Sequence, residues 1–209
     1  MGVLTDIRRE SQLAAHALST IRGQQMARSK LTFAVSAAFL LSAACASAPS
    51  PLDRVAEANA TIVNAAGDER GTAELWQDRD KIVHVEVQVM NLPPGPHGIH
   101  FHAVGKCDGS GSTPFATSAA HYNPLGRQHG LDNPAGPHAG DAPNFTVAAD
   151  GTGRASFTTD RVSLTEGSTS LLDADGSAIV IHASADDQTS QPAGNSGARI
   201  ACGVVKQTP

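Results

Sequence analysis

The sequence contains few aromatic, charged and sulfur-containing residues. Aromatic residues make up 4% and charged residues 17% of the 209 residues, with three cysteines, one Trp and one Tyr. No CxxC pair occurs, so thiol redox chemistry has no support. Basic residues nowhere cluster or alternate with aromatic residues, which argues against a nucleic-acid-binding surface. The sequence also lacks an internal repeat and a convincing helical period.

Turn-forming residues are plentiful: 20 Gly and 12 Pro are spread along the chain. Between them lie short stretches of alternating apolar and polar residues, the clearest being IVHVEVQV at 82–89. This pattern is typical of strands joined by turns. The strands are expected at 60–66, 71–77, 82–89, 98–104, 144–150, 154–160, 178–184 and 199–205. They predict an all-β domain, either a sandwich or a barrel.

The first fifty residues differ in composition from the rest. The segment 26–48 has a short basic start, an apolar run too short to span a bilayer comfortably, and small residues at its end, as an export signal requires. We therefore expect translation to start at Met26, with 1–25 a disordered upstream extension, 49–58 a linker and 59–209 the folded domain. Cys45 either carries a lipid anchor in a bacterial chain or is removed by cleavage after Ala48.

Removal of residues 1–48 would leave Cys107 and Cys202 as the only cysteines. In an oxidising compartment such a pair most simply forms one disulfide; two buried free thiols are the alternative. From residue 49 onward, ten Lys and Arg stand against eighteen Asp and Glu, a net charge of −8. An acidic protein repels anions, so an anionic substrate would need a local positive site.

Histidines are concentrated in one strand and in the aperiodic segment 105–142. His100 and His102 are two residues apart in GIHFH, so both rings point to the same side of a strand. The aperiodic segment contains three histidines and an aspartate, and a further histidine lies in AIVIHAS: His121, His129, His138, Asp141 and His182. A solvated His-rich loop is the other interpretation. Bonds to a metal ion, however, would explain how so long a loop stays ordered.

The number of these candidate ligands indicates two ions. Four imidazoles suit Cu²⁺, and three imidazoles with a carboxylate suit Zn²⁺. Six histidines and one aspartate supply seven residues for eight ligand positions, so one imidazolate must bridge both metals. His121, the first in the loop, is the best candidate. His84, on the polar face of its strand, and His97, in a turn after Pro96, are not expected to bind metal.

At this level of detail the sequence resembles the copper/zinc superoxide dismutases over about residues 59–206. The resemblance rests on GIHFH, HYNP at 121–124, the loop spacing His121-x7-His129-x8-His138-x2-Asp141, VIHASADD and GNSGARIACGVV. It implies an eight-stranded Greek-key β-barrel or flattened sandwich and a Cys107–Cys202 disulfide. The implied copper ligands are His100, His102, His121 and His182, and the implied zinc ligands are His121, His129, His138 and Asp141.

The resemblance also implies an activity, the disproportionation of superoxide to dioxygen and hydrogen peroxide. Arg199 would dock the anion beside copper, His121 would carry a proton, and Asp186 would accept hydrogen bonds from His100 and His129. The thirteen residues between Cys107 and His121, and a short loop 185–197 without lysine, match the bacterial branch. They imply a periplasmic protein, and leave open how substrate is steered and whether the chain forms a homodimer.

Two other functions start from the same residues. A copper-binding or copper-delivery protein could use this fold without turnover, although simple storage would not need an anion site at Arg199. A cupin-type oxygenase also begins with HxH on a strand. Cupins usually add a nearby Glu, and no Glu occurs between residues 87 and 165, so this alternative is weak.

Overall fold

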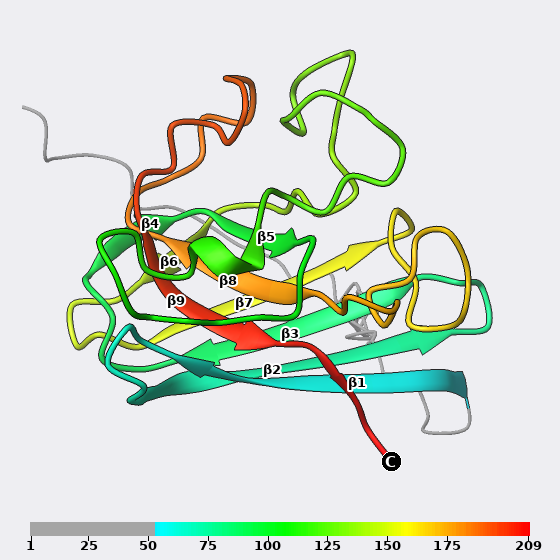
Figure 1. Cartoon of the computed structure of the whole chain (residues 1–209), viewed down its shortest axis with the longest axis horizontal. Helices are drawn as coiled ribbons and strands as arrows, with labels where there is room; N and C mark the ends of the chain where they lie inside the picture. Colours follow the sequence, from blue (N-terminus) through cyan, green and yellow to red (C-terminus); the bar gives the residue numbers. More distant parts are fainter. Residues whose placement is uncertain (1–52) are drawn as a thin grey trace, which may run out of the picture. The chain divides into compact units, whose positions relative to one another are not determined.

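The computed structural model describes residues 53–209, which belong to one compact unit, Ala46–Pro209. The predicted upstream extension, the export signal with Cys45 and the first residues of the predicted linker lie outside the described residues. Within 53–209 no helix is long and apolar enough to cross a membrane. One short 3₁₀ helix, Ala116–Ser118, interrupts the otherwise β and loop structure of these residues (Figure 1).

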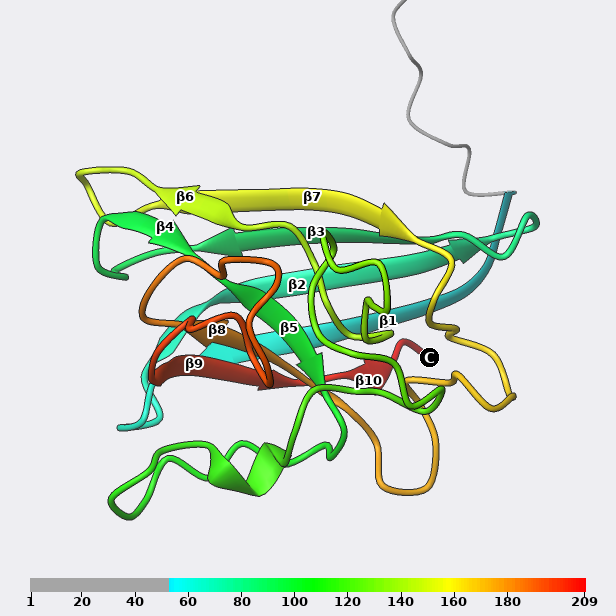
Figure 2. The same cartoon turned by 90° about the horizontal axis from the view of Figure 1, so that it is seen from above.

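Ten strands form one antiparallel sheet in the order β4-β6-β7-β3-β2-β1-β9-β8-β5, with β10 paired to β1. Its order is visible in Figure 2, where β6, β7, β3, β2 and β1 lie side by side. The strands are β1 (Arg54–Val63), β2 (Glu69–Asp78), β3 (Val83–Val89), β4 (Gly95–His97), β5 (Ile99–His102), β6 (Phe145–Val147), β7 (Gly153–Thr159), β8 (Ala178–His182), β9 (Arg199–Val204) and β10 (Lys206–Gln207).

The segment 95–102 nearly closes the sheet into a barrel. Its first half, β4, pairs with β6 at one end of the sheet order, and its second half, β5, pairs with β8 at the other end. β4, β6 and β7 lie side by side in that order, and β7 returns to pair with β3, which precedes β4 in the chain. This is the Greek-key arrangement. The predicted all-β Greek-key fold is therefore confirmed.

Two details of the prediction need correction. β4 and β10 are additional short strands, because Gly95–His97 pairs with β6 and Lys206–Gln207 pairs with β1. β1 begins at Arg54, so residues 54–58 of the predicted linker are strand. The first buried side chains of β1 are Ala58 and Ala60, and alanine gives only a weak strand signal.

The barrel interior is apolar, and the histidines lie outside it. Val83, Val85 and Val87 of β3 are at most 1% exposed and pack in the main core. On β5, Ile99 and Phe101 also point into this core. Because side chains alternate along a strand, His100 and His102 point to the outer surface of the barrel. The loop that follows β5 covers them there, so the fold places the site between barrel and loop.

Candidate metal centre

Backbone hydrogen bonds fix the long loop 105–142, the aperiodic segment of the sequence, onto β5. The Phe101 amide donates to the Gly140 carbonyl over 2.9 Å, and the Tyr122 amide donates to the Phe101 carbonyl over 2.8 Å. His100 forms a bridge with Asp141, and His102 forms one with His121. A Cβ at position 140 would collide with the Phe101 carbonyl oxygen, so this close approach requires glycine. The aperiodic segment is thus anchored against the HxH strand.

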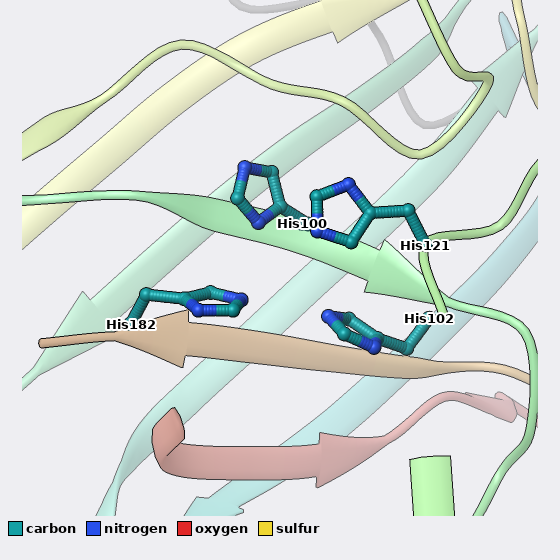
Figure 3. A group of neighbouring side chains, drawn as sticks. All are labelled: His100, His102, His121 and His182. Carbon is teal, nitrogen blue, oxygen red and sulfur yellow. The ribbon is translucent and has the colours of Figure 1, made fainter. Parts of the chain in front are cut away.

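The first group consists of His100, His102, His121 and His182. One ring nitrogen from each lies within 4.8 Å of those of the others, and no side chain is more than 6% exposed. Figure 3 shows these rings turned toward a common space, two from β5, one from β8 and one from the loop. Each ring keeps one buried nitrogen without a partner: His100 Nδ1, His102 Nε2, His121 Nε2 and His182 Nε2.

The opposite nitrogens of three of these rings have acceptors. His100 Nε2 donates to Asp186 over 2.6 Å, His102 Nδ1 to the Ala119 carbonyl over 2.9 Å, and His182 Nδ1 to the Gly197 carbonyl over 3.2 Å. These bonds fix the tautomer, so the unpartnered nitrogens carry lone pairs. Four convergent imidazole lone pairs are a donor set that fits copper.

Burial keeps three of the four rings, those of His102, His121 and His182, neutral. It lowers the pKa of His121 to about 4 and that of His182 to about 3, and it holds the pKa of His102 well below its usual range. A neutral ring is the form that can bind a metal, because protonation would occupy the lone pair. The site is therefore ready to accept a metal ion at neutral pH.

The second group consists of His121, His129, His138 and Asp141, again with ligand atoms within 4.8 Å of one another. Nδ1 atoms of the three histidines lie 2.9, 3.0 and 3.3 Å from Asp141 Oδ1. Burial disfavours the Asp141 carboxylate, but these histidine contacts outweigh it and hold the pKa of Asp141 well below its usual range. Three imidazoles and a carboxylate fit tetrahedral zinc. Residues 53–209 contain no third such group.

Asp186 connects the two groups. Its Oδ2 accepts the hydrogen bond from His100 Nε2, and its Oδ1 accepts one from His129 Nε2 over 3.0 Å. Burial opposes protonation of His129, but the hydrogen bonds to Asp141 and Asp186 raise the pKa of His129 to about 9. The two contacts expected of Asp186 are both present, one to a residue of each group.

Arg199 lies beside the first group, held by the loop 105–120. Its guanidinium donates to the carbonyls of Phe115 and Ala119, each over 2.6 Å, and to Ser118 Oγ over 3.1 Å. The Ala119 carbonyl also accepts from His102, so one oxygen joins the arginine to a copper-type ligand. Phe115 and Ala119 have φ of 61° and 63°, unusual for residues with a Cβ.

The predicted disulfide joins Cys107 to Cys202. With Phe115, Ala178 and Val180, these residues form a small apolar cluster separate from the main core. The cluster holds the loop 105–120, and with it the carbonyl groups that contact Arg199. Loop and arginine are therefore positioned by the same covalent and apolar contacts.

The other two histidines of residues 53–209, His84 and His97, have partners other than the side chains of the two ligand sets. Both nitrogens of His97 face carbonyl oxygens, of His182 and Pro93, and His84 Nε2 lies 2.9 Å from Asp78. Sequence reasoning missed the loop carbonyls that hold Arg199, because backbone acceptors have no sequence signature. It also missed Asn144, Gln188 and Gln191. These side chains join the loop 185–197 to the long loop 105–142, called the metal-binding loop below, or to the residues just after it.

Comparison with known proteins agrees with this geometry. Residues 69–205 match the family model described as copper/zinc superoxide dismutase. The chain is 43% identical over 150 residues to superoxide dismutase [Cu-Zn] 1 of Aquifex aeolicus, covering 71% of this chain and 86% of that protein. It is 41% identical over 152 residues to superoxide dismutase [Cu-Zn] of Caulobacter vibrioides, with the same coverage.

A solved structure is also similar to this chain in fold and sequence. The crystal structure of a SOD-like protein from Bacillus subtilis aligns with a TM-score of 0.64 and 38% identity, covering 70% of this chain and 96% of that one. Fold, ligand groups and sequence thus agree. The chain belongs to the copper/zinc superoxide dismutase family.

Proposed function

We propose that this protein catalyses the disproportionation of two superoxide anions and two protons to one dioxygen and one hydrogen peroxide. The observation that carries the proposal is the set of four buried imidazole nitrogens without partners, all directed at one space beside Arg199. His100, His102, His121 and His182 would hold copper. Family membership supports the same activity.

We further propose that zinc binds to His121, His129, His138 and Asp141, and that the His121 ring bridges the two ions. His121 Nε2 has no partner and belongs to the first group, whereas its Nδ1 lies 2.9 Å from Asp141 in the second. Only an imidazolate can offer a lone pair on each side of the ring. His121 is only 6% exposed, so its ring lies almost entirely inside the protein.

Copper, when bound, supplies one-electron oxidation and reduction, and zinc supplies charge and structure without redox chemistry. The protein's residues provide the other functions. Arg199 offers a fixed positive charge to a small anion in a domain of net charge −8. Asp186 holds the tautomer and orientation of His100. His121 Nε2 is the atom at which a proton for the product can be held.

Superoxide consumption by the reconstituted protein tests the activity. Copper and zinc contents are measured by elemental analysis in the same sample, and the metal-free protein serves as the control. We expect consumption in proportion to copper content. A full copper complement without superoxide consumption would instead support the copper-binding or copper-delivery alternative.

The bridge is tested by loading Cu²⁺ into both sites and recording the electron paramagnetic resonance signal. Two Cu²⁺ ions joined by one imidazolate couple magnetically, so we expect most of the signal to disappear. Two independent Cu²⁺ signals that sum to the full metal content would show that His121 does not bridge. This measurement does not depend on catalytic activity.

We also propose that the protein is exported to the periplasm, with 26–48 as its signal. The disulfide between Cys107 and Cys202 supports an oxidising compartment. Mass spectrometry of the mature N-terminus distinguishes a lipid-bearing Cys45 from cleavage after Ala48. A mature chain that still carries residues 26–48 would contradict the proposal.

A further inference from the structure

Among the amide side chains that join the two loops of the metal centre, Asn144 and Gln191 each make a paired contact with one residue of the opposite loop. Asn144 follows the metal-binding loop and makes a double contact with the backbone of Asp186. Its Nδ2 donates to the Asp186 carbonyl over 2.7 Å, and its Oδ1 accepts from the Asp186 amide over 2.8 Å. Both hydrogen-bonding groups of one side chain are thus used on one residue of the opposite loop.

Gln191 makes the same contact in the reverse direction. It belongs to the loop 185–197 and contacts the backbone of His129 in the metal-binding loop. Gln191 Oε1 accepts from the His129 amide over 2.9 Å, and Gln191 Nε2 donates to the His129 carbonyl over 3.0 Å. Each loop therefore holds one residue of the other through a paired amide contact.

The two residues held in this way are joined by their side chains. Asp186 Oδ1 accepts from His129 Nε2 over 3.0 Å, and both side chains are fully buried. Asp186 Oδ2 in turn accepts from His100 Nε2. Gly194 packs directly on this contact, where a Cβ would collide with the Asp186 carboxylate. The backbone positions of Asp186 and His129 thus determine how the carboxylate meets both rings.

We propose that Asn144 and Gln191 are positioning residues that keep His129 and Asp186 oriented for zinc, and through Asp186 also fix the copper ligand His100. The inference rests on the proposed zinc site. An amide side chain donates from its nitrogen and accepts at its oxygen at the same time, whereas an ionised carboxylate cannot donate and an apolar chain can do neither. Together with Gln188, these amides connect the loop 185–197 to the loop that carries His129 and Asp141.

The test is the rate at which the zinc-loaded protein loses zinc to an excess of a chromogenic chelator. The variants are Asn144→Leu and Gln191→Met, which keep side-chain size and remove the hydrogen bonds. The matched controls are Asn59→Leu on β1 and Gln88→Met on β3, both at exposed positions. We expect each variant to lose zinc about tenfold faster than wild type, which is the smaller end of the effects seen when a hydrogen-bond partner of a metal ligand is removed. The controls should lose zinc at rates within about twofold of wild type.

A second measurement separates positioning from general stabilisation. The midpoint of thermal unfolding is recorded with and without zinc. A purely structural role would lower both midpoints equally, whereas a positioning role reduces the increase that zinc produces. An unchanged zinc-induced increase together with wild-type zinc loss would overturn the inference.

Two outcomes remain distinguishable. If the wild-type protein retains no zinc, the proposed metal assignment fails, and the positioning role fails with it. If wild type retains zinc and the variants retain it equally, only the positioning role fails. Should an apolar variant not fold, Asn144→Asp and Gln191→Glu replace it. These changes remove the donor, keep an acceptor and add one negative charge, and Asn59→Asp and Gln88→Glu are the controls with the same added charge.

Discussion

Neutral, preoriented imidazoles are the main chemical feature of this protein at the scale of single residues. Burial favours the uncharged ring at His121 and His182, and a hydrogen bond to Gly197 fixes the tautomer of His182. The carbonyl of Ala119 has a double role, because it accepts from His102 and from Arg199. Ligand geometry and anion docking are therefore coupled through one backbone oxygen.

Replacing Arg199 with glutamate tests the docking role. We expect Arg199→Glu to lower kcat/KM for superoxide by about tenfold or more at low ionic strength, because a positive charge that attracts the substrate becomes a negative one. Copper content should not change. Arg154→Glu, at an exposed position on β7, alters the net charge equally and serves as the control. Equal activity in the two variants would remove Arg199 from docking.

At the scale of elements, the long loop is held in two different ways. Its second part, 121–142, is bound to β5 by backbone bridges and contains the zinc-type ligands. Its first part, 105–120, is held by the disulfide and by the small cluster around Phe115. A metal ion can therefore order one part, while covalent and apolar contacts hold the other.

Zinc removal should accordingly affect the loop more than the barrel. We expect chelation of zinc to increase protease cleavage within 121–142, because four ligand side chains lose their common partner. Strands β1 to β3 should remain protected by the apolar core. Limited proteolysis with mass spectrometry locates the cuts, and unaltered sensitivity of 121–142 would argue against zinc as the organiser of this loop.

Truncation of Phe115 tests the other part of the loop. The side chain is fully buried against Ala178, Val180 and Cys202, so we expect Phe115→Ala to lower the free energy of unfolding by about 3–5 kcal/mol. Chemical denaturation measures this loss. Leu125→Ala, at a side chain 60% exposed, should change stability by less than about 0.5 kcal/mol. Similar losses in both variants would show that the cluster contributes little.

The β2–β3 turn has a pH-dependent contact. Asp78 accepts from His84 and from the amides of Ile82 and Asp80. The bond to His84 is the main cause that lowers the pKa of Asp78 below 3.8, against the opposing effect of burial. A lowered carboxyl pKa stabilises the fold above the unfolded value and loses this effect as pH falls below it.

We therefore expect Asp78→Asn to destabilise the protein at neutral pH and not in acid. The loss should be less than about 1 kcal/mol, as for partly exposed pairs. It should diminish as the pH falls below the unfolded carboxyl pKa and through the lowered folded pKa of Asp78. Urea denaturation of the metal-free protein at neutral pH and in acid measures it. A loss that stays constant with pH would exclude the carboxylate as its origin.

At the scale of the whole molecule, the Cys107–Cys202 disulfide connects the loop 105–120 to strand β9 of the barrel. Cys107 and Cys202 are 95 residues apart, so the disulfide restricts a large part of the unfolded chain. We expect Cys107→Ser with Cys202→Ser to lower the free energy of unfolding of the metal-free protein by about 4–5 kcal/mol in the chain-entropy model. Chemical denaturation measures it, and a loss below about 1 kcal/mol would contradict a dominant role for loop closure.

The sequence alone determined the strands and the chemical types of the ligands. Alternation predicted β3 with its inward valines, and HxH placed His100 and His102 on one side of β5 because side chains alternate along a strand. The start of β1 was harder to predict, since its buried residues there include Ala58 and Ala60. The ligand set followed from residue types whose lone pairs suit copper and zinc.

Only the tertiary structure decided which backbone groups hold these residues. The Ala119 carbonyl joins His102 to Arg199. Asn144 and Gln191 connect the two loops. Both arrangements depend on contacts between segments far apart in the chain. Carbonyl and amide groups are present at almost every position, so no residue pattern marks the ones that will be used. Their roles arise only when folding brings the segments together.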